Sequence, residues 1–307
     1  MKTTLDCIPC IVRQALEMAR LVSNDPAVHE QILRDALLWT GEMELGQSPP
    51  IMVQRIHRKL RQITGVDDPY RPAKERLNNL AMELMPAFKT EIESADDPLL
   101  MTVRLAIAGN MLDLGINANL IEADVRQTMK QALTAPFFGE MDKFKQAIVD
   151  AQSILYLADN AGEIVFDRLL IEQLLEKHVT VVVRGAPVIN DATLIDAQAV
   201  GLDQIVEVID NGSDAPGTIL SDCSPDFRRR FAAADLIIAK GQGNFETLST
   251  EAGNIFFLFK VKCEVIAAHV QQPMGMQILI QAALARKDVA RVENGTINEP
   301  SITLNTP

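Results

Sequence analysis

The sequence predicts an α/β fold in which an N-terminal all-helical region packs on a Rossmann-like parallel sheet with flanking helices. Residues 1–150 carry apolar side chains at helical spacing, with no convincing alternation of the kind that marks β-strands. From residue 151 onward, short β-branched runs alternate with helical patterns, which is typical of a parallel sheet. We therefore expect a helical region over 1–150 and an α/β region over 151–307 that ends in a short polar tail.

Composition limits the classes of protein that the chain can represent. Its 307 residues are 48% hydrophobic, which is enough for two cores or for one core with a large added layer. The net charge of −12 argues against nucleic acid as a partner, because such binding relies on Lys and Arg neutralising phosphates. No window approaches the roughly 20 apolar residues that span a bilayer, and the N-terminus does not resemble a signal peptide. We expect a cytoplasmic protein with no membrane association, and no pattern indicates its oligomeric state.

Prolines mark most of the expected helix starts in the first 150 residues, since proline is tolerated at the first helical position. A first helix is expected over about 5–19. Later helices are expected to open at Asp25-Pro26, Pro49-Pro50, Asp68-Pro69 and Asp97-Pro98, and two more to lie near 119–134 and 139–149.

The fifth of these helices contains an unusual polar segment. Gly109 costs about 1 kcal/mol relative to Ala inside a helix, and Asn110 and Asp113 lie three residues apart on one otherwise apolar face. This face either meets solvent or lies over the sheet crevice, where the two side chains would contact a substrate.

Cys7 and Cys10 form a CxxC pair at the start of the first helix. Structural zinc sites usually need a second pair, and Cys223 and Cys263 do not supply one. The strand-then-helix context of a thioredoxin-like redox pair is absent as well. We expect both thiols to be reduced and not bridged by zinc, and the remaining interpretation is cysteine as a small core residue.

Polar residues follow three of the expected strands, which we place near 153–158, 179–183, 205–209, 235–239 and 255–259. The first is followed by Asp159-Asn160, the second by Asn190-Asp191 and the fourth by Lys240-Gly241. Carboxyl ends of parallel strands meet at one edge of a sheet, and ligands bind in the crevice there. The alternative for Asn190 or Asp191 is a helix N-cap, and Asp210-Asn211 after the third strand is best explained as a turn.

These groups suit the handling of a phosphate ester. Asp159, Asn160 and Asp191 offer hard oxygen ligands for a divalent cation, which could polarise the ester and activate a nucleophile. Lys240 would place a positive charge beside the phosphoryl oxygens, and Gly241 would let backbone N–H groups approach them. We therefore expect Asp159 and Lys240 to be catalytic, while the nucleophile could be metal-bound water or Asp159 itself.

The order of the motifs resembles the DUF89 family of metal-dependent damage-control phosphatases, and the CxxC pair is similar to that of its prokaryotic branch. The resemblance covers almost the whole chain. It rests on Asp6-Cys7-xx-Cys10, Gly109-Asn110-xx-Asp113, Asp159-Asn160-Ala-Gly162-Glu163, Pro187-Val-Ile-Asn190-Asp191-Ala-Thr193 and Lys240-Gly241-Gln-Gly243-Asn244.

The resemblance implies a metal site in the crevice of a Rossmann-like domain, holding Mn²⁺, Co²⁺, Ni²⁺ or Mg²⁺. It implies Asp159, Asn160 and Asp191 as ligands and Lys240 as a phosphate contact. The residues that it implies in the substrate pocket are Asn110, Asp113 and Glu163, beside Lys240 and Gly241. The implied substrate is a small phosphorylated metabolite, such as a sugar phosphate or a damaged phosphometabolite.

Three alternatives stay open at this point. A nucleotide-cofactor enzyme, such as an S-adenosylmethionine-dependent carboxyl methyltransferase, would need a G-x-G-x-x-G turn after the first strand, where the chain has Asp159-Asn160-Ala-Gly162. A haloacid-dehalogenase-type phosphatase would have two aspartates two residues apart at this turn, and Ala161 takes the second place. A protein that binds metal or a phosphosugar without turnover would carry the same residues.

Overall fold

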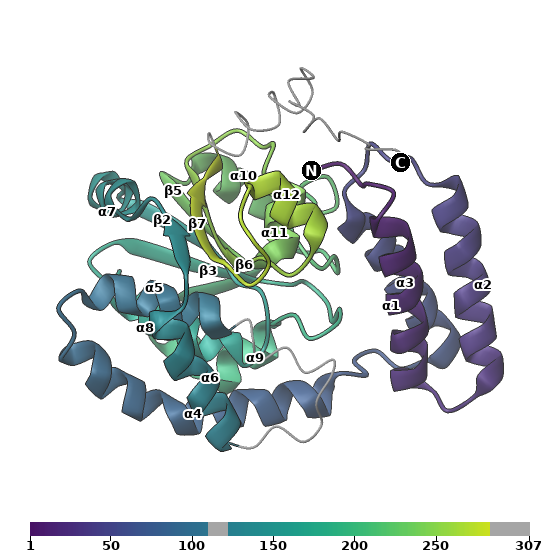
Figure 1. Ribbon diagram of the computed structural model, residues 1–307, viewed down its shortest axis with the longest axis horizontal. Helices are drawn as coiled ribbons and strands as arrows, with labels where there is room; N and C mark the ends of the chain where they lie inside the picture. Colours follow the sequence, from purple (N-terminus) through teal and green to yellow (C-terminus); the bar gives the residue numbers. More distant parts are fainter. Residues whose placement is uncertain (110–121, 283–307) are drawn as a thin grey trace, which may run out of the picture.

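A seven-stranded sheet forms the centre of the part of the chain that the computed structural model describes, residues 1–109 and 122–282 (Figure 1). The strand order is β1-β7-β6-β5-β2-β3-β4, and neighbouring strands run parallel except for β6 and β7. The strands are β1 (Phe137–Gly139), β2 (Ser153–Leu157), β3 (His178–Val183), β4 (Glu207–Asp210), β5 (Leu236–Lys240), β6 (Ile255–Lys260) and β7 (Gln277–Gln281).

The sequence predicts β2 to β6 within a few residues, and the predicted fold class is confirmed. It misses β1 and β7, which pair with each other at one end of the sheet, so the expectation of no β-structure before residue 150 is wrong at β1. That strand has three residues, two of them exposed, and pairs with β7 through its backbone. Such a short segment cannot show a period of two, and the apolar centre of β7 is too brief to be assigned by periodicity.

The direction in which successive strands are added to the sheet reverses between β2 and β5. From β2 the chain adds β3 and β4 on one side, then returns to the other side of β2 to add β5 and β6. Such a reversal is the place where ligands bind in open α/β sheets, because the helices after the two central strands lie on opposite faces and leave a crevice. The turns after β2 and β5 are those that contain Asp159-Asn160 and Lys240-Gly241.

Two hydrophobic cores cover the two faces of the sheet. Ile154 and Tyr156 of β2 belong to one core, and Leu155 and Leu157 belong to the other, as strand alternation requires. The first core is closed mainly by α4 to α9, and the second by α10 to α12. These helices are α4 (Arg71–Glu93), α5 (Pro98–Ala108), α6 (Glu122–Thr134), α7 (Met141–Asp150), α8 (Glu163–Glu172), α9 (Leu194–Ala199), α10 (Pro225–Ala233), α11 (Gly241–Leu248) and α12 (Glu264–Val270).

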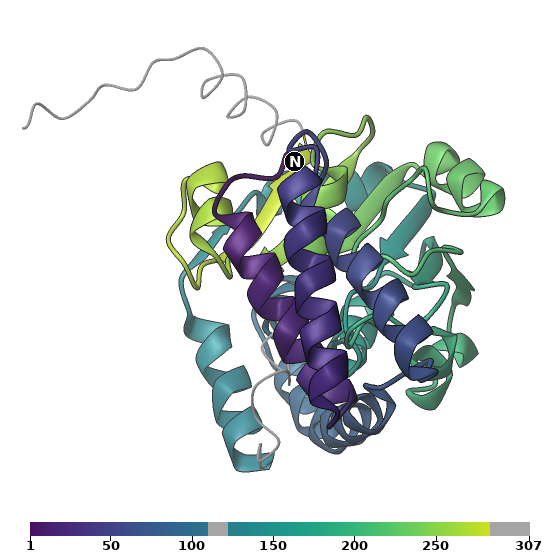
Figure 2. The same cartoon turned by 90° about the vertical axis from the view of Figure 1, so that its right-hand side faces the viewer.

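The first three helices, α1 (Cys7–Val22), α2 (Pro26–Glu42) and α3 (Pro49–Thr64), pack against each other around a third core. Figures 1 and 2 show them as a group beside the α/β unit. Arg61 of α3 ties this group to the loops at the crevice, because its guanidinium donates to the Pro187 carbonyl at 2.8 Å and pairs with Asp214.

Three of the predicted proline-marked starts are confirmed, at α2, α3 and α5. The fourth is wrong, since α4 begins at Arg71 rather than at Pro69. The Asp68 carboxylate accepts a hydrogen bond from the Tyr70 N–H at 3.1 Å, which forms a turn ahead of the helix. No helix in the described ranges is long and apolar enough to cross a membrane.

Candidate functional site

The turn after β2 holds two of the predicted ligands. Asp159 and Asn160 are buried there, at 9% and 7% exposure. The Asp159 carbonyl accepts a hydrogen bond from the Ala192 N–H at 2.8 Å, and Asn160 pairs with Asp191 as an isolated antiparallel bridge. Backbone pairing of the loops after β2 and β3 thus brings Asp159, Asn160 and Asp191 together.

Asp191 is not the cap of α9, so that alternative is wrong, as it is for Asn190. The N-cap is Thr193, whose N–H and hydroxyl donate to the Asp196 carboxylate at 2.9 and 2.7 Å. This capping box moves the start of the helix beyond Asp191. The Asp191 carboxylate instead accepts a hydrogen bond from Arg184 Nε at 2.6 Å.

Arg184, the last residue before the turn after β3, joins the carboxylates of both loops. Its Nη2 lies 3.4 Å from Asp159 Oδ1, its Nε contacts Asp191, and its Nη1 donates to Asn244 Oδ1 at 3.3 Å. Its side chain is 2% exposed. We call Arg184, Asp159 and Asp191 the front cluster. Sequence reasoning assigned no role in the site to Arg184, although an arginine that ends a β-branched run was a usable signal.

Lys240 is the last residue of β5 and has no exposure to solvent. Its Nζ donates to the Ala106 carbonyl at 2.7 Å, to Glu163 Oε1 at 2.7 Å and to Asp167 Oδ1 at 2.5 Å. We call Lys240, Glu163 and Asp167 the rear cluster. An ammonium group has three hydrogens, so a phosphate contact by Lys240 would require one of these acceptors to be exchanged. That contact stays a prediction.

Gly241 lies directly against the predicted ligand Asp159. Its φ is +78°, and a Cβ built on it would lie 1.9 Å from Asp159 Oδ2. Glycine is therefore required here to make room for the carboxylate, whereas the predicted contact of Gly241 with a substrate stays a prediction.

Lys262 adds a positive charge that the motifs did not reveal. It is exposed in the loop after β6, and its charge lowers the pKa of Asp159. Its backbone N–H donates to Gln242 Oε1 at 3.2 Å, which ties this loop to the start of α11. A lysine just beyond a strand that neighbours β5 was the signal that could have identified it.

The electrostatics of the turn favour a bound cation. Burial raises the pKa of Asp159 well above its usual range, and the charges of Glu163 and Asp191 raise it further. The two clusters together contain four buried carboxylates and two buried basic groups, so their ionised forms have two negative charges in excess. A divalent cation would balance this excess.

The oxygen donors also fit such an ion, because carboxylate and amide oxygens are the preferred ligands of hard cations. Among the described residues, no three Asp, Glu, His or Cys side chains are arranged to bind one metal ion. The residues that could hold it are therefore the carboxylates of Asp159 and Asp191 together with the amide oxygen of Asn160.

Helix α4 supports both ligand loops from the helical region. Asn78 Oδ1 accepts a hydrogen bond from the Gly162 N–H at 2.6 Å, and its Nδ2 donates to Asp196 Oδ1 at 3.1 Å. Lys74, one turn earlier, pairs with Asp196 at 2.8 Å. Both side chains are buried. Two polar residues four apart on the apolar face of a helix were a signal that sequence reasoning did not use.

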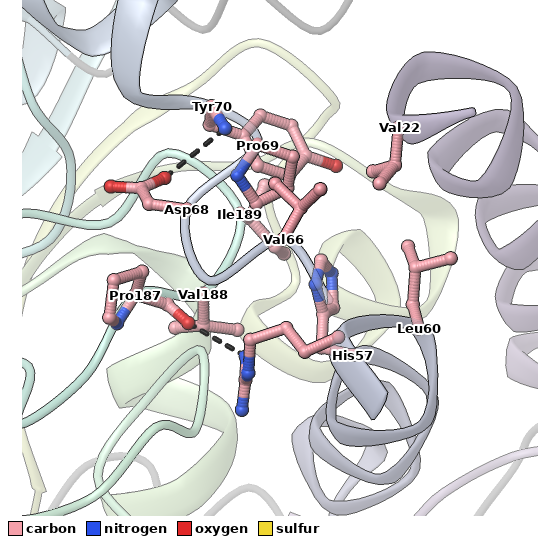
Figure 3. A pocket seen from close by; sticks show the side chains of 11 residues that line it. Val22, His57, Leu60, Val66, Asp68, Pro69, Tyr70, Pro187, Val188 and Ile189 are labelled. Atoms are coloured by element: carbon pink, nitrogen blue, oxygen red, sulfur yellow. Dashed lines mark hydrogen bonds between the residues drawn. The ribbon is translucent and has the colours of Figure 1, made fainter. Parts of the chain in front are cut away.

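A small cavity lies where α3 meets the loop after β3 (Figure 3). Its volume of about 10 Å³ has room for one water molecule and not for a metabolite. His57, which lines it, is buried, and burial together with the charge of Arg61 lowers its pKa to about 3. His57 is therefore neutral at physiological pH and cannot serve as a general acid there.

A larger hollow of about 420 Å³ adjoins the front cluster beside α9. Arg184 and Pro187 of the segment after β3 line it, together with Asp68 and Arg71. Its volume falls in the range of small-molecule sites, roughly 300–1,000 Å³.

Asn110 and Asp113, which the sequence predicts in the substrate pocket, lie outside the described residues.

The CxxC pair lies at the start of the first helix, as predicted. Cys7 begins α1 and is buried, while Cys10 Sγ accepts a hydrogen bond from Gln14 Nε2 at 3.6 Å. All four cysteines are free thiols.

Residues 3–278 match the family model of the damage-control phosphatase ARMT1-like domain. A damage-control phosphatase of Archaeoglobus fulgidus is 34% identical over 90% of this chain and 97% of its own length. Damage-control phosphatase PH1575 of Pyrococcus horikoshii is 31% identical over 92% and 98%. The crystal structure of this DUF89 family protein from Pyrococcus horikoshii superposes with a TM-score of 0.84 at 29% identity, covering 92% of this chain and 99% of that one.

Proposed function

Since the chain belongs to the ARMT1-like (DUF89) family of damage-control phosphatases, we propose that it hydrolyses phosphate monoesters of small metabolites with the help of a divalent cation. The observation that carries this proposal is the set of buried oxygen donors, Asp159, Asn160 and Asp191, at the reversal point of the sheet. The buried negative charge there exceeds what Arg184 and Lys240 neutralise, so this place suits a cation better than an apolar ligand.

Mn²⁺, Co²⁺, Ni²⁺ and Mg²⁺ all fit a site of carboxylate and amide oxygens. Bound there, such an ion would polarise the phosphoryl oxygen and lower the pKa of a water molecule. Asp159 and Asp191 supply the negative charge that holds it. Arg184 fixes both carboxylates from one side, which limits their rotation before any substrate arrives.

A basic side chain of the protein would stabilise the phosphoryl group. Lys262 is exposed and its charge reaches Asp159, so we assign to it the phosphate contact that the sequence suggested for Lys240. A positive charge near the phosphoryl oxygens stabilises the negative charge of the transition state. Hydrolysis would transfer the phosphoryl group to water and release an alcohol, and the hollow beside Arg184 has room for the organic part of the substrate.

A nucleotide cofactor fits this crevice poorly. In dinucleotide-binding sheets the pyrophosphate lies at the N-terminus of the helix after the first strand. Here the buried carboxylate of Glu163 begins that helix, and Asp159 precedes it in the turn. Two carboxylates in the place of a pyrophosphate disfavour a methyltransferase or dehydrogenase, and no described contact favours either activity.

Phosphate release from a panel of phosphosugars, with and without Mn²⁺ or Co²⁺, tests the proposal directly. Asp159→Ala and Asp191→Ala should abolish both turnover and metal binding, whereas Lys262→Ala should keep the metal and lower kcat/KM on the order of 10²-fold. A wild-type protein that binds the metal but releases no phosphate would be a binding protein. One that retains S-adenosylmethionine in dialysis would support the methyltransferase alternative.

A further inference from the structure

The amide of Asn160 has a defined orientation in the structure. Its Nδ2 lies 2.9 Å from Asp159 Oδ2 and 3.0 Å from Glu163 Oε2. An ionised carboxylate only accepts hydrogen bonds, so the NH₂ group and not the carbonyl oxygen must face Glu163. The amide oxygen is consequently directed away from Glu163.

Glu163 is itself held in place by the rear cluster. It has no exposed surface, and its other oxygen, Oε1, accepts a hydrogen bond from Lys240 Nζ at 2.7 Å. Lys240 is fixed in turn by Asp167 and by the Ala106 carbonyl of α5. Each Glu163 oxygen therefore has a separate partner, one on Lys240 and one on Asn160.

The end of α5 packs closely against Glu163. A Cβ built on Gly109 would lie 3.1 Å from both Cα and Cγ of Glu163 and 3.3 Å from the ring of Phe166. Gly109 thus lets α5 pack closely on the first turn of α8. This packing explains the helix glycine that the sequence singled out.

We propose that Glu163 is a positioning residue that fixes the amide of Asn160 with its oxygen toward the cation, and that Lys240 and α5 hold Glu163 for this purpose. This inference rests on the proposed function, since it presumes a cation bound by Asn160. It assigns Glu163 and Lys240 to the support of the ligands rather than to contact with the substrate. Partners of this kind change metal affinity by about 10- to 100-fold when they are removed.

At pH 8, where Asp167 has lost its proton, two variants that remove the same charge test this role. Glu163→Gln and Asp167→Asn each remove one carboxylate from Lys240 while keeping the size of the side chain, but only Glu163 touches Asn160. With Glu163→Gln, the new amide can donate a hydrogen bond to Asn160, which allows the Asn160 side-chain amide to flip and exchange its oxygen and NH₂ group. We therefore expect at least 10-fold weaker Mn²⁺ binding in titration calorimetry. Asp167→Asn should stay within about 3-fold of the wild type.

Glu163→Asp separates geometry from charge. It keeps the negative charge but is one methylene shorter, so it cannot reach Lys240 and Asn160 together. Positioning predicts weaker Mn²⁺ binding for this variant than for Asp167→Asn, whereas an effect of charge alone predicts the opposite order, which would overturn the inference. Thermal unfolding of each metal-free variant shows whether it is folded. If Glu163→Asp is unfolded, the Mn²⁺ affinity of Glu163→Gln, which keeps the size of the side chain, tests whether Glu163 positions Asn160.

The same titration separates this inference from the proposed function. A wild-type protein that binds no divalent cation would refute both. Metal binding by the wild type, with unchanged affinity in Glu163→Gln, would refute only the role of Glu163.

Discussion

The front and rear clusters are built from the same kinds of groups and differ in how firmly they are enclosed. Each contains one buried base between two carboxylates, and Asn160 Nδ2 donates to one carboxylate of each cluster, Asp159 and Glu163. In the rear cluster no side chain is exposed, and both ion pairs are 2.7 Å or shorter. In the front cluster Asp159 and Asp191 keep 11% and 5% side-chain exposure, and one contact of Arg184 extends to 3.4 Å.

This difference predicts different roles for the two clusters. A fully enclosed ion cluster has a high cost of rearrangement, because every exchanged partner leaves an uncompensated charge away from water. The front cluster borders the crevice, so water or a ligand can replace a lost contact. We therefore expect the rear cluster to determine stability and to affect activity only through the Asn160 amide, whereas the front cluster determines activity directly.

Lys240→Met should give the largest effect on stability. It leaves Glu163 and Asp167 buried without their base, and breaking a buried pair in this way costs about 3–5 kcal/mol. Chemical denaturation of the metal-free protein measures the change in the free energy of unfolding. The control is Arg34→Met, which removes a surface pair whose side chains are 75% and 64% exposed and should cost less than about 1 kcal/mol.

A stable Lys240→Met protein that binds Mn²⁺ normally but lacks activity would contradict this division of roles, because loss of the support for Asn160 would weaken metal binding. Such a result would mean that Lys240 reaches the phosphoryl group after giving up one of its acceptors, as the sequence alone suggested. The assignment of the rear cluster to stability would then be wrong.

Arg184→Lys should give a smaller effect on stability and a clear effect on turnover. The variant keeps the positive charge but loses the planar fork that contacts Asp159, Asp191 and Asn244 at once. We expect kcat/KM to fall by about 10- to 100-fold, the range for groups that orient ligands, while the free energy of unfolding changes by less than it does in Lys240→Met. Steady-state kinetics beside denaturation shows whether the two effects separate.

Much of the fold could be predicted from the sequence, for a physical reason. Strands β2, β3, β5 and β6 are buried on both faces, and such strands appear as continuous apolar runs with clear ends. Strand β1 depends on its partner β7 rather than on its own three residues. Its pairing is non-local, so no local pattern could reveal it.

The site was predictable only in part, because its residues are defined by contacts between distant segments. Asp159, Asn160 and Asp191 follow strands, so the rule for strand ends finds them. The contacts of Lys240 depend on α5 and α8, which lie 134 and 77 residues away in the sequence. The cap position of Thr193 was readable from Asp196 three residues later, and that signal was overlooked in favour of Asn190 and Asp191.

The smallest expected effect is a pH dependence of the free energy of unfolding that arises in the rear cluster. Burial, aided by the charge of Glu163 and opposed by Lys240, raises the pKa of Asp167 to about 7, from an ordinary value of 3.8. The folded protein therefore binds this proton more tightly than the unfolded chain does. The stability that the proton contributes is fully present below about pH 4 and is lost as the pH rises through about 7. Asp167→Asn cannot titrate, so it lacks this dependence.

The measurement is the free energy of unfolding of the wild type and of Asp167→Asn between pH 4 and pH 8, with a chelator present to keep metal out of the front cluster. Other groups, such as Asp159, also titrate, but they contribute to both proteins, so the difference between the two isolates Asp167. We expect the stability of the wild type relative to the variant to decline across this range and to level off above pH 7. A constant difference would mean that Lys240 keeps Asp167 ionised throughout. The rear cluster would then be a fixed set of charges, with no proton to lose.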